Sequence, residues 1–156
     1  MIPQFLKPVE ALAPAADAAG RTGDYISLKN VHCVFVVVHI TQGNAATVAL
    51  TLEQATDVSG TGSKAITVTV PIWANQDTAT SDTNTRQTDA VSFTTSAAVK
   101  NKLIVFKVDP EFLDQANSFD CLTVKTGASN AANITQAMYY VSQRYAADPA
   151  PTSITD

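Results

Sequence analysis

The sequence predicts an all-β protein: an antiparallel β-sandwich of the jelly-roll type, with an immunoglobulin-like Greek key as the alternative. The strongest observation is the run at residues 31–40, which is rich in β-branched and aromatic side chains and contains neither Gly nor Pro. Few of its members are polar, so we expect a central strand with both faces covered over most of its length. Shorter apolar or alternating runs follow, separated by turn-forming residues, and no run of helical period lies between them.

The opening residues, 1–23, have the character of an extended N-terminal arm. Pro3, Pro8 and Pro14 exclude a regular helix. The apolar side chains between them are too numerous for a free tail, so a neighbouring molecule is expected to cover them. We therefore expect the arm to lie outside the strand pattern and to form a protein interface through Ile2, Phe5, Leu6, Val9 and Leu12.

The rest of the chain divides into a β-sandwich domain at residues 24–145 and a C-terminal coil at 146–156. A chain of 156 residues suits one domain with its own core. Pro149 and Pro151 interrupt the last residues, which carry no strand pattern. We therefore expect one folding unit between two irregular ends.

In the first half of the domain the pattern predicts a hairpin and a further strand. The runs 31–40 and 47–53 flank a turn signal at 41–44, so we expect them to pair as an antiparallel hairpin. Residues 66–70 alternate Ile and Val with Thr and predict another strand. A short strand at 24–28 precedes the hairpin.

In the second half, residues 73–88 are polar and predict a long surface excursion. A short helix from Pro110 to about Ala116 is expected, because Asp109 suits an N-cap and proline suits the first helical position. Further strands are expected at 90–94, 103–108, 119–126 and 134–141. From these patterns the predicted core includes Val34, Val36, Val38, Leu50, Val105 and Val124.

The chain also repeats a short motif between strands. Residues 129–134, SNAANI, resemble residues 43–48, GNAATV, and each block lies between two predicted strands. Six residues of small polar sequence hint at two similarly built halves.

Side chains that could carry chemistry are few, and we predict no catalytic, cofactor-binding or metal-binding residue. His32 and His39 are seven positions apart in one strand, so they face opposite sides and cannot hold one metal ion. Cys33 and Cys121 lie in strand-like runs, where free cysteine is usually a small buried hydrophobe. The sequence therefore predicts a protein that is not an enzyme and needs no cofactor.

Composition limits the partners. The formal charge is −4 and Lys and Arg do not cluster, which argues against nucleic acid as a partner. No apolar run reaches the roughly 20 residues of a membrane helix, and prolines interrupt the N-terminal residues that a signal peptide would need. Only 15% of residues are charged, which suits a protein that lies against other protein. We expect the protein in a reducing cytoplasm or in a particle assembled there.

Several blocks resemble one family, the head decoration or cement proteins that stabilise the capsids of tailed phages. The blocks are QFLKPV (4–9), AADAAGRTGDY (15–25), QGNAATVAL (42–50), IWAN (72–75), KTGASNAANI (125–134) and RY (144–145). The resemblance implies a β-rich, often trimeric module that binds the outside of an icosahedral shell and braces neighbouring capsomers. We thus expect a non-enzymatic virion structural protein on the capsid surface, assembled in the host cytoplasm, with the major capsid protein and further copies of itself as partners.

Two alternatives remain at this stage. A protein of the tail, neck or fibre would be present in a few copies per virion, whereas a capsid protein would match the stoichiometry of the shell. A carbohydrate-binding module on a β-sandwich would need exposed aromatic side chains, and Trp73 is the one tryptophan. Loss of glycan binding on Trp73→Ala would support this last class.

Overall fold

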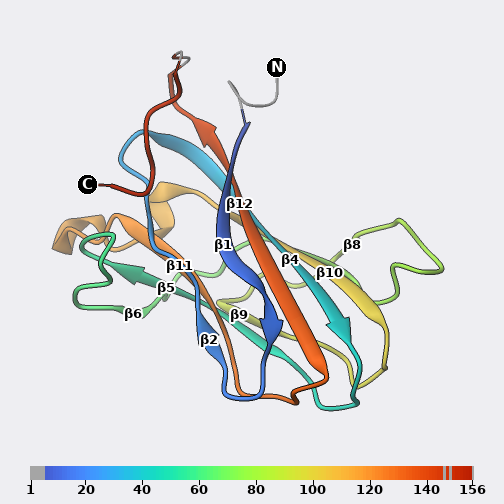
Figure 1. Cartoon of the computed structure of the whole chain (residues 1–156). Coiled ribbons are helices and arrows are strands. Elements are labelled where there is room, and N and C mark those ends of the chain that lie inside the picture. Colours follow the sequence, from blue (N-terminus) through green and yellow to red (C-terminus); the bar gives the residue numbers. More distant parts are fainter. Residues whose placement is uncertain (1–5, 146, 148, 156) are drawn as a thin grey trace.

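A computed structural model describes residues 6–145, 147 and 149–155, and it shows two antiparallel sheets packed face to face (Figure 1). Sheet A has the order β1 (Leu6–Ala16), β12 (Asn133–Gln143), β4 (Val31–Gln42), β10 (Asn101–Val108), β7 (Ile72–Asn75) and β8 (Thr85–Arg86). Sheet B has the order β2 (Arg21–Thr22), β11 (Cys121–Thr126), β5 (Ala49–Ala55) and β6 (Lys64–Ala65), with β3 (Ile26–Ser27) beside β11 and β9 (Ser92–Thr94) beside β5. The predicted antiparallel β-sandwich is confirmed.

The strand pairing is that of a jelly roll. β1 pairs with β12, β2 and β3 pair with β11, β4 pairs with β10, and β5 pairs with β9. The pairs are nested, from the two ends of the chain toward its middle, as in a long hairpin that has been rolled into two sheets. An immunoglobulin-like Greek key does not nest its strands in this way.

β4 lies at the centre of sheet A, between β12 and β10, and extends the predicted strand by two residues. Its inward side chains, Val34, Val36, Val38 and Ile40, are fully buried. Its outward side chains from Phe35 to His39 remain partly exposed, so the expectation that both faces are covered is wrong for the outer face.

The core lies between the sheets and includes five of the six predicted positions. Val105 is the exception, because it faces outward while Ile104 and Phe106 face inward. Both faces of β10 carry apolar residues, so alternation alone does not tell the inner face from the outer. Tyr139 crosses the core, where its hydroxyl accepts a bond from the Val124 amide (3.1 Å) and donates to the Asp24 carbonyl (2.9 Å).

The predicted hairpin between the runs at 31–40 and 47–53 is wrong. β4 belongs to sheet A and β5 to sheet B, so the connection between them crosses from one sheet to the other. A turn signal between two apolar runs fits a crossing of this kind as well as a hairpin, because both reverse the chain.

Two other local predictions are corrected. Residues 66–70 form no strand of their own: β6 ends at Ala65, Val70 makes one bridge to Ala90, and Val68 is exposed. The predicted helix is two 3-10 turns, Pro110–Phe112 and Gln115–Asn117, and the Asp109 side chain makes no capping bond. Short turns suffice here because the segment only links β10 in sheet A to β11 in sheet B.

From Leu6 onward, the N-terminal segment is part of the sandwich and not an arm outside it. Residues 6–16 form β1, which pairs with β12 from Leu6 to Ala16 through two irregularities of register. Proline is tolerated because β1 is an edge strand: on its outer side there is no neighbouring strand to which a backbone N–H would donate. Leu12 is buried in the core and Val9 packs against it. Ile2 and Phe5 lie outside the described residues.

A buried ion pair closes the far end of β1. The Asp17 carboxylate is fully buried and accepts bonds from Arg21 Nε (3.1 Å), from Thr126 Oγ1 (2.9 Å) and from the Thr135 hydroxyl. The Arg21 guanidinium also donates to the carbonyls of Ala13 (2.7 Å) and Ala15 (3.1 Å). These bonds satisfy backbone groups of the β1 strand and tie both sheets together.

The two blocks of similar sequence form the crossings between the sheets, at the lower end in Figure 1. In each block an asparagine side chain accepts a bond from the amide two residues later: Asn44 from Ala46 and Asn130 from Ala132, both at 2.9 Å. The buried Asn133 side chain joins them by accepting from the Asn44 amide (2.8 Å) and donating to the Ala46 carbonyl (2.7 Å). The sequence echo therefore marks two turns of one design.

Residues 149–155 include neither helix nor strand. They still contact the sandwich, because the Ser153 carbonyl accepts the Ser27 amide (2.7 Å) and the Pro151 carbonyl accepts Lys7 Nζ (2.9 Å). The edge of β3 is covered in this way.

Candidate protein-binding face

The described residues contain no group of three or more His, Cys, Asp or Glu side chains placed to hold a metal ion. Cys33 and Cys121 are both buried and unbonded to each other. Burial, with a smaller contribution from Asp109, raises the pKa of the Cys33 thiol and makes it a poor nucleophile. None of the described helices has the length and apolar character needed to cross a membrane.

A buried lysine is the most unusual polar group in the core. Lys102 is fully buried, and its Nζ donates to Gln42 Oε1 (2.8 Å) and to the carbonyl (2.5 Å) and hydroxyl (3.0 Å) oxygens of Ser96. Burial lowers the pKa of the Lys102 amine. Because Lys102 and Gln42 are both buried and bonded to each other, we assign the cluster to the framework and not to a binding site.

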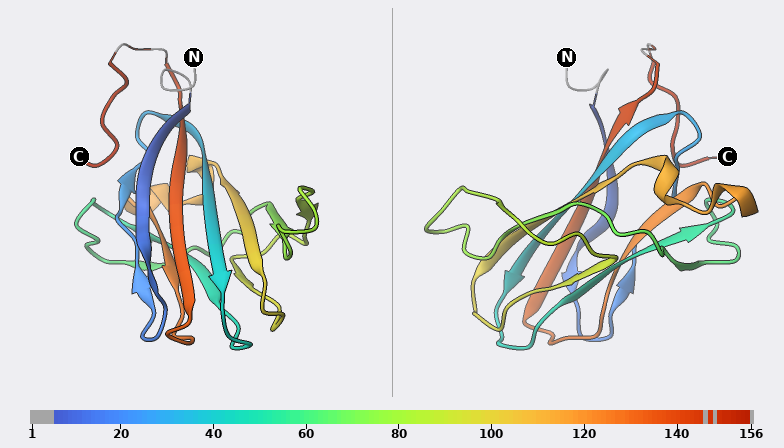
Figure 2. Two further views of the ribbon diagram at one scale, coloured as in Figure 1. Left: turned by 45° about the vertical axis from the view of Figure 1, so that its right-hand side comes forward. Right: turned by 180° about the vertical axis from the view of Figure 1, so that it is seen from behind.

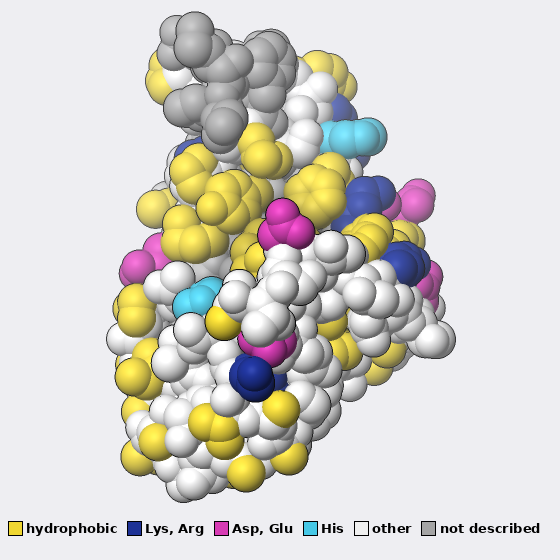
Figure 3. Space-filling view, turned by 90° about the vertical axis from the view of Figure 1, so that its right-hand side faces the viewer, with side chains coloured by type: hydrophobic (Ala, Val, Ile, Leu, Met, Phe, Trp, Pro, Cys, Tyr) yellow, Lys and Arg dark blue, Asp and Glu magenta, His cyan; other side chains and the backbone are white. Residues whose placement is uncertain are grey.

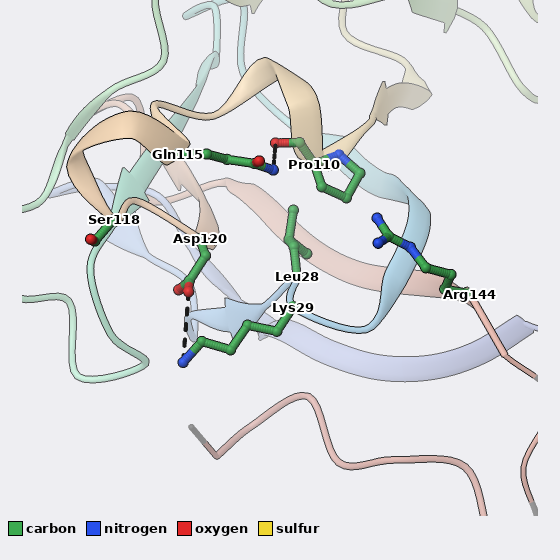
Figure 4. A pocket seen from close by; sticks show the side chains of 7 residues that line it. All are labelled: Leu28, Lys29, Pro110, Gln115, Ser118, Asp120 and Arg144. Carbon is green, nitrogen blue, oxygen red and sulfur yellow. Dashed lines mark hydrogen bonds and ion pairs between the residues drawn. The ribbon is translucent and has the colours of Figure 1, made fainter.

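Two adjoining hollows lie at one end of the sandwich. One has a volume of about 350 Å³, and Figure 4 shows the side chains around it, with Lys29 and Asp120 paired at 3.6 Å and Gln115 Nε2 donating to the Pro110 carbonyl (2.9 Å). The second, of about 330 Å³, shares Pro110, Gln115 and Arg144 with it. The charged side chains around the two hollows are three acidic and three basic: Asp109, Glu111, Asp120, Lys29, Lys107 and Arg144. Because the acidic and basic side chains are equal in number, the two hollows favour neither anions nor cations.

The outer face of sheet A is a different kind of surface, because apolar side chains lie next to one another across its strands. In one row, residues in register run Glu10, Met138, Val37, Val105, Trp73 and Arg86. The row above it runs Pro8, Tyr140, Phe35 and Lys107, and the row below runs Gln136, His39 and Leu103. Figure 2 shows β1, β12, β4 and β10 side by side on this face. We call the seven large apolar members, Phe35, Val37, Trp73, Leu103, Val105, Met138 and Tyr140, the sheet A patch.

All seven side chains of the sheet A patch are half-buried. Strand spacings of about 4.8 Å and a rise of about 3.4 Å per residue give each position on the face about 33 Å², so the seven side chains cover roughly 230 Å² within a rectangle of roughly 400 Å². The apolar part is therefore a few hundred Å², which approaches the size of the largest apolar patch on a typical monomer. Figure 3 shows hydrophobic side chains gathered in a band on this side of the molecule.

The outer face of sheet B is polar by comparison. Thr51 lies in register with Lys125, which lies in register with Thr22. Lys125 Nζ contacts Glu53 Oε1 at 3.0 Å, and this ion pair crosses from β11 to β5. One face of the sandwich thus has the alternation expected of a solvated antiparallel sheet, and the other does not.

Trp73 is placed at the margin of the patch, and part of it is already covered. The Arg86 guanidinium lies 4.9 Å from the centre of its ring. Tyr140 also lies on this face, whereas the neighbouring Tyr139 is in the core. A sugar ring could therefore not stack on the face of the Trp73 indole that Arg86 covers.

The structure separates the residues that the sequence analysis grouped as an interface. Leu12 and Val9 face the core of their own domain, and Leu6 is half-buried beside Ser142 at the start of β1. The sheet A patch was missed. Its signal is visible in the sequence as apolar residues on both faces of β4 and β10, where a solvated sheet would alternate with polar residues.

Comparison with known proteins finds no matching family model and no matching curated protein. Among solved structures, the SPBc2 prophage-derived protein YomS is 10% identical, with 86% of this chain and 95% of that chain covered and a TM-score of 0.45. A carbohydrate-binding module, CBM4, is 10% identical over 87% and 69% with a TM-score of 0.32. A chain of the cowpea mosaic virus top component, a naturally occurring empty particle, is 11% identical over 94% of both chains with a TM-score of 0.28. These scores are too low to support a function for this chain.

Proposed function

We propose that this chain is a non-enzymatic structural protein of a phage virion that binds the outer surface of the capsid and stabilises the shell by bridging capsomers. The observation that carries the proposal is the sheet A patch, which leaves seven large apolar side chains partly exposed on one face while the other face is polar. An apolar patch with polar margins is the usual mark of a protein–protein contact. The blocks that resemble head decoration proteins support the same class of partner.

The surroundings of the patch favour protein over other partners. Glu10 and Arg86 stand at the two ends of the central row, and Lys107 lies beside Phe35, so charge is confined to the margin. This is the arrangement of an interface core with a polar rim. An apolar patch of roughly 230 Å² is less than a third of the roughly 800 Å² that one partner buries in a standard interface, so the polar margin must also make contact.

The proposed partner is the major capsid protein, and the resemblance also implies self-association as a trimer. The test uses shells assembled from the major capsid protein of the same genome in the absence of this chain. We expect the purified protein to sediment with these shells and to raise their resistance to heat. Side-chain-resolution imaging of the virion then gives location and copy number, and a few copies at the neck or tail would overturn a capsid role.

Substitutions on the two faces give a matched pair. Val37→Glu places a carboxylate at the centre of the patch, and we expect shell binding about 30-fold weaker or more, since truncation at the centre of an interface typically costs 2 kcal/mol or more. Thr51→Glu makes the same change in the polar face of sheet B and should leave binding within about twofold. Equal binding by both variants and wild type would show that sheet A is not the contact surface.

A further inference from the structure

The central row on the outer face of sheet A has an order that is complementary to itself. It begins with an acidic residue, Glu10 on β1, and ends with a basic residue, Arg86 on β8, and both side chains are exposed. The four strands between them contribute four members of the sheet A patch: Met138, Val37, Val105 and Trp73. The midpoint of the row lies between β4 and β10, which are also the two middle strands of the sheet. A second copy turned about this midpoint presents the same residues in reverse.

Two copies stacked face to face can be related by a two-fold axis that runs parallel to the strands, between β4 and β10. This axis places β4 over β10 of the second copy, β12 over β7 and β1 over β8. Packing of sheets with their strand directions within about 30° of each other is an ordinary arrangement. In the central row the facing pairs are Val37 with Val105, Met138 with Trp73, and Glu10 with Arg86. Each pair occurs twice, because a two-fold contact uses the same surface of both copies.

The side chains that face each other match in chemistry. Valine meets valine at the centre, the thioether of Met138 meets the indole of Trp73, and an acid meets a base at each end. In the row above, the axis sets Phe35 opposite Lys107 of the second copy, so a cation lies against an aromatic ring. The face is therefore suited to a copy of itself.

Charge selects this axis over the other axis that a face-to-face pair could use. An axis along the central row would set Glu10 over Glu10 and Arg86 over Arg86, so like charges would meet. Other charges at the margin of the face are paired within each copy: Lys107 with Asp109 (2.9 Å), Lys100 with Asp77 (2.8 Å) and Arg86 with Asp89. Because Arg86 keeps Asp89 as a partner, Glu10 fixes the orientation of the two copies more than it adds to the strength of their contact.

From this order we infer that two copies of the free protein pair face to face through sheet A, about a two-fold axis parallel to the strands. The occupant of the face is a second copy of this chain. The consequence for assembly rests on the proposed function: one face cannot hold a shell and a second copy together, so the pair must separate before either copy docks. Pairing thus keeps the sheet A patch covered until a shell is present.

The size of the contact indicates a weak pair. At about 33 Å² per position, the three rows give roughly 430 Å² in each copy. A standard interface buries about 800 Å² per partner, and smaller ones are typical of transient contacts. We therefore expect the pair to dissociate on dilution, with single copies dominant at about 1 μM and pairs dominant at about 1 mM.

Sedimentation velocity measures the pairing across that range of concentration for wild type, Val37→Glu and Thr51→Glu. We expect Val37→Glu to weaken pairing about 30-fold or more, because the substitution lies at the centre of the contact and enters it twice. Thr51→Glu adds the same charge to sheet B and should pair within about twofold of wild type, and circular dichroism checks that both variants are folded. A wild type that stays a single copy at about 1 mM, or that forms trimers without pairs, would overturn the inference. Pairing by Val37→Glu as tight as that of wild type would overturn it too.

Crosslinking tests the axis. Met138→Cys and Trp73→Cys place thiols at facing positions, whereas the two copies of position 138 are three strands apart, about 14 Å along the sheet. A short bismaleimide should therefore join the two variants when they are mixed and should join neither variant to itself. Both native cysteines are buried, so wild type is the control. Crosslinking of Met138→Cys to itself would indicate the axis along the row and contradict the proposed pair.

Shell binding separates this inference from the proposed function. The crosslinked pair should no longer sediment with shells, and the same mixture before crosslinking is its control. A crosslinked pair that binds as well as that mixture would refute the competition for one face. A wild type that pairs and does not bind shells would overturn the proposed function and leave the pairing in place. A wild type that binds shells and never pairs would overturn the pairing alone.

Discussion

Replacing Lys102 with methionine should leave the protein as stable as wild type or make it more stable, although the lysine makes three hydrogen bonds. Methionine has nearly the length and flexibility of the lysine stem, so it fills the same space without the amine. Both main acceptors keep another donor, because Gln42 Oε1 also accepts Thr95 Oγ1 (2.9 Å) and the Ser96 carbonyl also accepts Gln42 Nε2 (2.9 Å). The substitution therefore removes a buried amine and strands neither of these acceptors.

The magnitude follows from two opposed terms. Burial of an ammonium group costs several kcal/mol, and hydrogen bonds to a charged group each contribute about 1.5–3 kcal/mol. We expect these to leave a gain of about 1–2 kcal/mol in the free energy of unfolding at pH 7 for Lys102→Met, since apolar replacements of buried charges are often neutral or stabilising. A gain of that size corresponds to a rise in Tm of about 2–8 °C for a domain of this length.

The pH dependence identifies the cause. Because the pKa of Lys102 is lowered in the folded state, the folded protein binds fewer protons than the unfolded chain, and stability rises with pH from the lowered value to about 10.4. Lys102→Met should abolish this rise in urea titrations at pH 7 and pH 10. Gln42→Leu, by contrast, removes the shared acceptor and should cost about 3–5 kcal/mol. Destabilisation by more than about 2 kcal/mol in Lys102→Met would refute the reasoning, because the bonds would then outweigh the burial.

The other predictions concern the core, the first strand and the cysteines. Val36→Asp should abolish soluble folding and Val37→Asp should not, because Val36 is fully buried and Val37 faces outward; expression and circular dichroism compare the two. Tyr139→Phe should destabilise by about 1–3 kcal/mol in urea titration, since the Val124 amide loses its hydroxyl acceptor in the core, and an unchanged midpoint would contradict this. Removal of residues 1–14 should lower the Tm sharply, because it deletes most of β1; a truncated protein with the wild-type Tm would show that β1 adds nothing to the sandwich. Chelator or reductant alone should leave the Tm unchanged, and a shift would reveal a metal or disulfide that the spacing does not predict.

The sandwich was predictable because its strands carry strong local signals. Residues 31–40 have the composition of a central strand whatever surrounds them, and β4 occupies that place. Sheet membership was not predictable for β5, because the residues at 41–48 suit a hairpin turn and a crossing between sheets equally well. β1 was misread because Pro8 and Pro14 interrupt the pattern of a regular strand, while an edge strand tolerates them.

The candidate face was harder to predict for a related reason. In β10 the inner face carries Ile104, Phe106 and the buried Lys102, while the outer face carries Leu103 and Val105. Alternation along the strand separates the two sets of side chains but does not tell which set faces the core. Because Lys102 belongs to the inner set, the sequence makes that set look like the solvent-facing one. Only the pairing of four neighbouring strands shows that the outward apolar residues form one surface.

The pairing of β1 with β12 has a consequence for how the protein is made. These strands are the first and last of the chain, and they lie side by side along sheet A. β1 leaves the ribosome long before β12 is synthesised, so sheet A is completed only after the strands between them have been made. The nested order makes each outer pair wait for the pair inside it, and long-range pairing of this kind folds slowly and leaves strand edges open to aggregation meanwhile. Yield of soluble protein should therefore depend on the conditions before β12 has paired with β1, such as temperature and chaperone supply.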